Sequence, residues 1–161
     1  MLQDPFMFYG TVASNIKLYH PTMTQEEIEA AAQFVHADEF IRQLKNGYAH
    51  EVIEKGSAFS SGQRQLIAFA RTMAIQPKVL ILDEATANID SETEEAIQQS
   101  LNRMRTGRTT IAIAHRLSTI QDADQILVLN KGKIVERGTH ESLIAQEGIY
   151  YKMYQLQLNG A

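Results

Sequence analysis

Acidic and imidazole side chains stand directly behind two apolar runs of this sequence. The run at residues 79–82 ends in Asp83 and Glu84, and the run at residues 109–114 ends in His115. One carboxylate suits a hard cation such as magnesium, a second can orient or deprotonate a water, and an imidazole can hold a water or a phosphate. Simpler explanations stand beside these, because an acid can merely cap the next element and a strand-end histidine can bond to backbone.

A third candidate is the string FSSGQRQ at residues 59–65, where a serine–glycine turn precedes a helical pattern. Such a turn exposes backbone N–H groups and the positive end of a helix dipole, which together bind anions. Ser60 and Gln63 also explain the pattern as an ordinary capping box. A capping box does not need Gly62, whose missing side chain suits a phosphate lying against the backbone.

The elements that must position these residues include three amphipathic helices. Apolar residues recur at helical spacing within residues 28–35, 66–74 and 96–104, which predicts a helix with one buried face in each stretch. Pro77 ends the second of these helices. Capping boxes mark the expected helix starts at Thr24, Ser60 and Ser91.

Strands alternate with these helices in the second half of the chain. Besides the two apolar runs, residues 126–138 indicate two short strands around an NKGK turn, and Thr139 is the expected N-cap of a closing helix. Apolar strands that alternate with amphipathic helices predict an α/β fold with a mostly parallel sheet covered on both faces.

Sheets of this kind bind ligands beyond the carboxyl ends of their strands. If the two apolar runs are strands that point the same way, Asp83, Glu84 and His115 meet at one edge of the sheet. This constellation is the predicted chemical centre of the protein.

The composition is that of a globular protein without disulfides. The chain has 161 residues, a formal net charge of -4 and no cysteine. This charge and the lack of a basic cluster argue against a nucleic-acid partner, and no apolar run is long enough to span a bilayer. Any link to a membrane is therefore expected to come through a partner or another segment.

Taken together and in this order, these strings resemble the nucleotide-binding domain of ATP-binding cassette (ABC) transporters of the exporter type. LQDPFMFYGTVASNI is similar to the Q-loop segment, with Gln3 as its glutamine, and FSSGQRQ is similar to the signature motif. VLILDEA resembles the Walker B strand, TANID the D-loop with Asp90, and AHRLSTI the H-loop with His115.

The resemblance implies a P-loop NTPase (ABC ATPase) fold over residues 1–161. Residues 1–9 would form the Q-loop segment, residues 10–76 a helical subdomain with the signature motif, and residues 77–161 part of the catalytic core. No G-x-x-x-x-G-K-[ST] string occurs in the sequence. The expectation is a domain that lacks its N-terminal strands and phosphate loop, binds ATP poorly alone and hydrolyses it negligibly.

The resemblance also assigns a role to each residue of the nucleotide site. Asp83 would hold Mg²⁺, and Gln3 would sense the metal and the terminal phosphate of ATP. Glu84 would polarise the attacking water, and His115 would contact that water and the phosphate. Transfer of a phosphoryl group to water needs positioning and charge neutralisation more than covalent chemistry.

Other residues are implied to act between two domains. Members of this family pair head to tail, so Ser60, Gly62 and Gln63 would grip the terminal phosphate of ATP bound to the opposite ATPase domain. Asp90 would lie at the contact between the two domains. A transmembrane domain would be the other partner and would hold the chain at the cytoplasmic face of the membrane.

Two positions depart from the family pattern. The usual signature is L-S-G-G-Q, whereas Ser61 replaces a glycine here while the acids of Walker B are intact. This combination resembles one half of a heterodimeric exporter with one impaired ATP site. Ile53 stands where the family often has a glycine, near the expected contact with the membrane domain.

Three functions are compatible with these residues. The first is the ATP-hydrolysing part of an exporter, which couples hydrolysis to transmembrane transport. The second is a non-catalytic interaction module that lends its signature turn to a partner ATPase. The third is an inert fragment.

Overall fold

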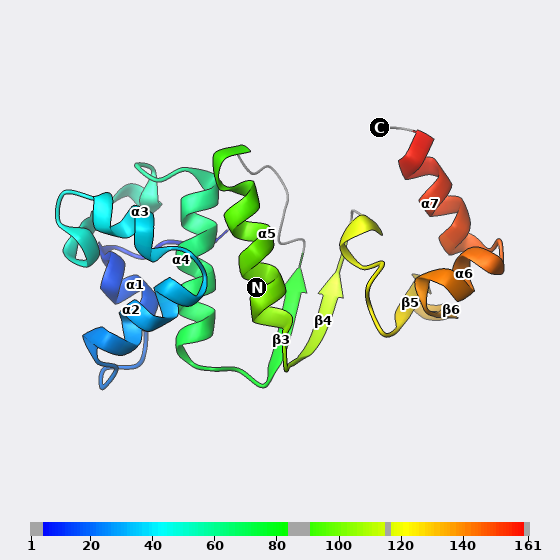
Figure 1. Cartoon of the computed structure of the whole chain (residues 1–161), viewed down its shortest axis with the longest axis horizontal. Helices are drawn as coiled ribbons and strands as arrows, with labels where there is room; N and C mark the ends of the chain where they lie inside the picture. The colour runs from blue at the N-terminus through cyan, green and yellow to red at the C-terminus, as the bar shows by residue number, and fades with distance from the viewer. Residues whose placement is uncertain (1–4, 84–90, 115–116, 160–161) are drawn as a thin grey trace. The chain divides into compact units, whose positions relative to one another are not determined.

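The computed structural model describes residues 5–83, 91–114 and 117–159, with backbone only for residues 91–94 and 118. The chain forms two compact units, Met1–Ile111 and Ala112–Ala161 (Figure 1).

The first unit is mainly helical. Its helices are α1 (Val12–Lys17), α2 (Gln25–Phe34), α3 (Asp38–Gln43), α4 (Ser61–Ala74) and α5 (Ser91–Arg105), with short 3-10 turns η1 (Gly47–Ala49) and η2 (Glu54–Gly56). Its strands are β1 (Gly10–Thr11), β2 (Glu51–Val52) and β3 (Val79–Asp83). β1 pairs antiparallel with β2. The helical subdomain expected at residues 10–76 is still a prediction.

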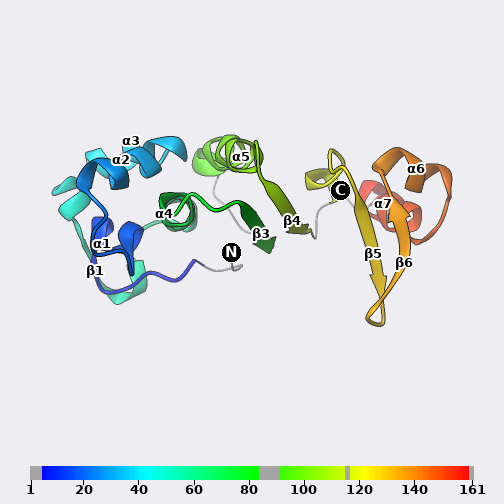
Figure 2. The same ribbon diagram turned by 90° about the horizontal axis from the view of Figure 1, so that it is seen from below.

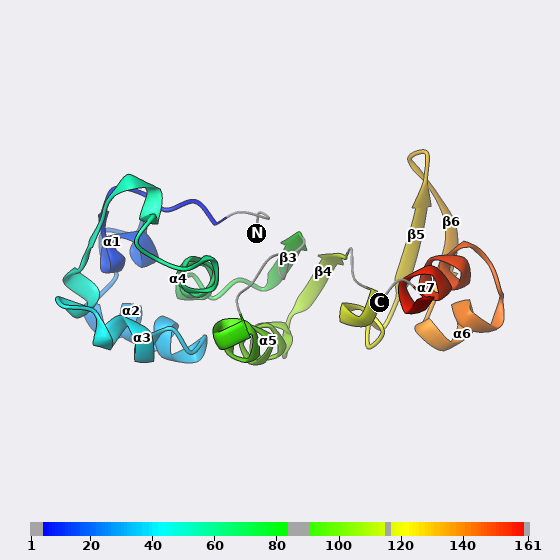
Figure 3. The ribbon, with the colours of Figure 1, turned by 90° about the horizontal axis from the view of Figure 1, so that it is seen from above.

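Helix α4 is the centre of the first unit. It packs against α1 and α2 on one side and α5 on the other, and it lies between them in all three views (Figures 1–3). The predicted face is buried at Leu66, Ile67, Ala70 and Met73. Phe69 is also fully buried, because helices cover α4 on more than one side.

The predicted helix starts are confirmed where their side chains are described. Thr24 Oγ1 accepts the Glu27 N–H at 3.2 Å, and Glu27 Oε2 accepts the Thr24 N–H at 2.8 Å. Thr139 caps α6 in the same manner, with Ser142 as its reciprocal partner. The capping box expected at Ser91 depends on side chains outside the described residues.

Strand β3 joins β4 (Thr109–Ile113) in a two-stranded sheet, and both arrows point the same way in Figure 1. The expectation of helices on both faces is met on one face only within the described residues. Leu80 and Leu82 are buried, whereas Val79 and Ile81 are 54% and 53% exposed. The alternation arises because successive side chains of a strand point to opposite faces, and the described helices pack on one of them.

The second unit is a hairpin with two helices. β5 (Ile126–Asn130) pairs antiparallel with β6 (Lys133–Gly138), as the NKGK turn predicted. Lys131 and Gly132 both have positive φ, 48° and 75°, which is typical of the tight turns that match strand twist. Helices α6 (His140–Ala145) and α7 (Ile149–Asn159) lie beside the hairpin (Figures 2 and 3).

A small core holds this second unit together. It consists of Leu117, Ile126, Val128, Leu143 and Tyr150. The Glu136 carboxylate of β6 accepts the backbone N–H groups of Ile149 and Tyr150, the latter at 2.9 Å. A carboxylate at this helix end satisfies unpaired N–H groups and complements the helix dipole.

Within the part of the chain that the structure describes, every helix is too short or too polar to cross a bilayer.

Candidate nucleotide site

The turn at Ser60–Gln63 forms a complete capping box at the start of α4. Ser60 Oγ accepts the Gln63 N–H at 3.2 Å, and Gln63 Oε1 accepts the Ser60 N–H at 3.1 Å. The capping box predicted from the sequence is therefore confirmed. It does not use up the hydrogen-bond donors that an anion would need. A serine hydroxyl that accepts one bond still has its own hydrogen to donate, and the Gln63 amide nitrogen still carries two donors.

The residue before this turn is firmly anchored. Phe59 is only 4% exposed, and its ring meets the His50 ring edge to face at 5.9 Å between centroids. Its carbonyl oxygen accepts a hydrogen bond from the Arg64 guanidinium. Gly62 is buried within the first turn of α4. The turn thus presents Ser60 and Gln63 from a fixed base.

The short segment at residues 5–9, which follows Gln3, is attached to the same helical unit. Met7 is 1% exposed. A Cβ atom built on Gly56, which has a φ of 77°, would come within 2.9 Å of Met7 Cγ. Only glycine fits this close approach without strain. The loop that leads to Ser60 therefore packs directly on the segment that follows Gln3.

Two polar residues that the sequence analysis did not select hold this segment. Asn15 on α1 is 0% exposed, and its side chain accepts the Phe8 N–H at 2.8 Å and donates to the Phe8 oxygen at 2.9 Å. Arg71 on α4 donates to the Phe6 oxygen at 3.0 Å. The sequence contains only a weak indication of this role. Asn15 lies between Val12 and Ile16 on a buried helical face, where a polar residue needs a hydrogen-bond partner.

The acid end of β3 supplies the metal-binding candidate. Asp83 is the last residue of β3 and is half-buried. A single protein carboxylate at such an edge fits the usual ligation of Mg²⁺, which keeps several waters and substrate oxygens. Thr109 at the start of β4 donates its N–H to the Lys78 oxygen at 3.2 Å. The two strands are neighbours, as the predicted constellation requires.

The remaining candidates, Gln3, Glu84, Asp90 and His115, lie outside the described residues. Their convergence with Asp83 is therefore still a prediction. Ile53, the position where the family often has glycine, is described and is 48% exposed.

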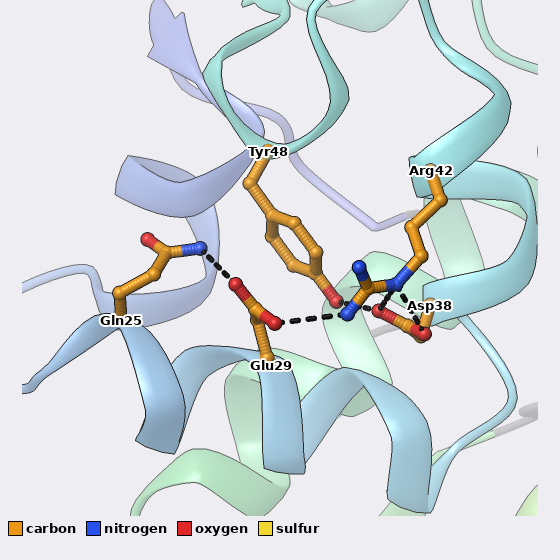
Figure 4. A network of polar contacts seen from close by, with 5 residues as sticks. All are labelled: Gln25, Glu29, Asp38, Arg42 and Tyr48. Atoms are coloured by element: carbon orange, nitrogen blue, oxygen red, sulfur yellow. Dashed lines mark hydrogen bonds and ion pairs between the residues drawn. The ribbon is translucent and has the colours of Figure 1, made fainter.

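A polar network braces the helices of this unit (Figure 4). Arg42 on α3 contacts Asp38 at 2.8 Å and Glu29 on α2 at 2.9 Å, and the Tyr48 hydroxyl donates to Asp38 at 2.6 Å. Burial by itself would raise the pKa of Asp38, but the bonds from Arg42 and Tyr48 outweigh it and hold the pKa below its usual value. Burial and the Asp38 carboxylate raise the pKa of Tyr48.

The network holds η1 in place through Tyr48, and β2 follows η1 directly in the chain. Gln25 on α2 extends the network through Glu29, at 2.9 Å. β2 precedes the loop that leads to Ser60, and its partner β1 directly follows the segment at residues 5–9. The network therefore supports the strand pair that connects these two segments. The network has no nucleotide chemistry of its own, and its role is to hold the scaffold.

Comparisons with known proteins identify the family. A family model described as ABC transporter matches residues 2–87. A putative ABC transporter ATP-binding protein of Streptococcus pneumoniae, exp8, is 64% identical over 98% of this chain and 27% of its own length. An ATP-dependent lipid A-core flippase of Shewanella oneidensis is 53% identical over 96% of this chain and 26% of its own length.

A solved structure agrees with these relatives. It is described as a bacterial Atm1-family ABC exporter with ATP bound, and it matches with a TM-score of 0.86 and 41% identity over 96% of this chain and 27% of that chain. The chain belongs to the ABC transporter family, and its fold is the P-loop NTPase fold of an exporter nucleotide-binding domain. The chain spans about a quarter of the length of the curated relatives it matches.

Proposed function

We propose that this chain is the ATP-binding and ATP-hydrolysing part of an ABC-type exporter and couples hydrolysis to transmembrane transport. The observation that carries the proposal is the Ser60–Gln63 capping box at the head of a 14-residue helix. The hydrogen-bond donors of Ser60 and Gln63 remain available to an anion such as a phosphate of ATP. The chain belongs to the ABC transporter family, whose members use ATP. Asp83 at the end of β3 supplies the acidic counterpart.

The chain's own nucleotide would be held from the strand edge. Asp83 and Gln3 would hold Mg²⁺, which when bound neutralises charge on the phosphate oxygens. Glu84 would orient and deprotonate the attacking water, and His115 would hold that water against the terminal phosphate. All four groups act by positioning and electrostatics, which is the main source of rate in phosphoryl transfer to water.

The signature turn would act on a second ATPase domain. The Ser60 hydroxyl, the Gly62 N–H and the Gln63 amide would donate to the terminal phosphate of ATP on that domain, and the positive end of α4 would add to their attraction. Asp90 would lie at the contact between the two domains. The transmembrane domain of the exporter would place both at the cytoplasmic face of the membrane.

The second domain is proposed to be a different chain. Ser61 adds a side chain where the family has glycine in its signature, while the acids of Walker B are kept. The acids would then serve the competent ATP site, and the altered signature would face the weaker one. Replacing Ser61 by Gly is expected to raise ATP turnover or nucleotide trapping at the weaker site. If neither turnover nor trapping changes, the proposed heterodimer is contradicted.

The decisive experiment measures ATP hydrolysis in the assembled exporter with two variants. Glu84→Gln is expected to reduce turnover by about a hundredfold or more, because a water-orienting base is lost. Ser60→Ala is expected to reduce turnover at the partner's site. If Glu84→Gln leaves turnover unchanged while Ser60→Ala lowers it, the chain is the non-catalytic module instead. If neither variant matters, the nucleotide function is wrong.

A further inference from the structure

Arg71 is a half-buried cation held by neutral oxygens. Its Nε donates to the Asn15 backbone oxygen at 2.7 Å, one terminal nitrogen donates to the Phe6 oxygen at 3.0 Å, and the other donates to Asn15 Oδ1 at 3.1 Å. The guanidinium carbon lies 5.4 Å from the centre of the Phe8 ring. Burial lowers the pKa of Arg71. Among the described residues, no carboxylate pairs with it.

Asn15 completes the same cluster from α1. Its Oδ1 accepts both the Phe8 N–H and the Arg71 guanidinium, and its Nδ2 donates to the Phe8 and Thr11 oxygens, at 2.9 and 3.0 Å. The side chain therefore uses both lone-pair directions and both hydrogens. A buried polar group that is satisfied on every side fixes its neighbours in one arrangement.

The two residues join two neighbouring pieces of chain near the N-terminus to α4, and the Arg71 contacts span 56 and 65 residues of sequence. The segment at residues 5–9 follows Gln3, α1 carries Asn15, and α4 carries Arg71. Arg71 lies ten residues after Ser61 on one continuous helix, which is about 15 Å of helical rise from the signature turn. A helix is stiff over that length, so a contact at Arg71 constrains where Ser60 and Gln63 lie.

We propose that Arg71 and Asn15 are positioning residues that fasten the main chain at residues 6–8, shortly after Gln3, to the signature helix, so that residues 6–8 and the signature turn move as one body. The attachment of residues 6–8 to α4 is inferred from the contacts alone. Its effect on ATP turnover rests on the proposed ATPase function. The guanidinium fork suits the task because it holds three oxygens in one plane, which a lysine cannot do.

The link is tested first without nucleotide. Backbone amide exchange in the full chain is measured by NMR for Arg71→Met, which keeps the apolar length of the side chain and removes its donors. Exchange at residues 6–9 is expected to rise about tenfold, as for the loss of one or two hydrogen bonds. Arg71→Lys should give a smaller rise, because it keeps one donor group in place.

Two variants serve as controls for this measurement. Ile67→Val removes buried volume from the same helix but no hydrogen bond to residues 5–9, and it should raise exchange throughout the unit without a preference for that segment. Arg42→Met removes an arginine whose contacts are with Asp38 and Glu29, and it should leave residues 6–9 unchanged. Equal exchange of residues 6–9 in Arg71→Met and wild type would overturn the link.

The consequence for catalysis is tested in the assembled exporter by a double-mutant cycle. Gln3→Ala and Arg71→Met are each expected to lower the ATP turnover number about tenfold. If Arg71 acts through the Gln3 segment, the double variant is also about tenfold slower rather than a hundredfold. The effects of Ile67→Val and Gln3→Ala on the turnover number should multiply. Ile67→Val acts only by lowering the fraction of folded protein, and that fraction does not depend on Gln3.

The outcomes separate this inference from the proposed function. Additive effects of Gln3→Ala and Arg71→Met would overturn the positioning role. If the wild-type assembly does not hydrolyse ATP, the proposed function fails, and the exchange measurement still decides whether the link exists.

Discussion

Ser60 illustrates at the residue scale how a structural group can also be a chemical one. Its hydroxyl oxygen caps the start of α4 by accepting the Gln63 N–H, and its hydrogen can still be donated in another direction. Thr24 caps α2 with the same geometry and the same type of partner, Glu27. Both hydroxyls accept one N–H of the first helical turn, and only Ser60 belongs to the proposed signature turn. The pair therefore separates the cost of losing a cap from the cost of losing a phosphate ligand.

Replacing either cap residue by alanine is expected to destabilise the chain by about 1 kcal/mol, because one helix N–H loses its acceptor. Urea unfolding of Ser60→Ala and Thr24→Ala measures this cost. In the assembled exporter, only Ser60→Ala should also lower ATP turnover. Equal turnover in the two variants would show that the Ser60 hydroxyl has no role beyond capping.

The stability contributed by Asp38 is expected to depend on pH. Its folded pKa is depressed, so its contribution is fully present above the pKa of the unfolded chain, near 4, and is lost as the pH falls through the folded pKa. Asp38→Asn should therefore destabilise the chain at pH 7, and the difference from wild type should shrink below about pH 4.

The measurement is urea unfolding of both proteins over that pH range. Glu39→Gln, which removes a carboxylate at an exposed position of the same helix, is the matched control. A difference between wild type and Asp38→Asn that stays constant down to pH 2 would contradict the assignment.

At the scale of the elements, β3 and α4 are buried in different ways. α4 is enclosed by α1, α2 and α5, whereas β3 buries alternate side chains in the core of the same unit and exposes the others. Hydrophobic residues on both faces of a strand predicted full burial. Within the described residues, only one face of β3 is covered.

Adjacent residues of β3 should therefore respond differently to truncation. Leu80→Ala is expected to cost about 2–4 kcal/mol, because a buried side chain leaves a cavity. Ile81→Ala, at a side chain that is 53% exposed, should cost less than about 1 kcal/mol in this chain. Urea unfolding compares the two, and equal losses would mean that both faces of β3 are covered.

At the scale of the whole molecule, the proposed nucleotide chemistry would be divided between chains. The sequence contains the acid end of Walker B and a signature turn, and it contains no phosphate-loop string. A phosphate loop supplies backbone N–H groups, a lysine and a hydroxyl ligand for the metal. High affinity for ATP is therefore expected of an assembly rather than of these 161 residues alone.

Calorimetric titration of the isolated chain with Mg²⁺ and ATP is expected to give a Kd weaker than about 100 μM, because too few phosphate contacts are present. Mixing the chain with a complete nucleotide-binding domain of a relative, and titrating again, serves as the comparison. A micromolar Kd for the chain alone would contradict this expectation.

The sequence by itself determined the local features of this protein. Helix starts at Thr24, Ser60 and Thr139, the buried face of α4 and the turn at Lys131–Gly132 all follow from short-range spacing and backbone chemistry, and the motif order indicated the family. Tertiary structure alone decided which side of β3 is covered and which polar residues brace the unit. Asn15 and Arg71 are 56 residues apart in sequence, and their partnership exists only because α1 packs on α4. Local spacing does not encode such a contact, since it depends on how whole helices meet.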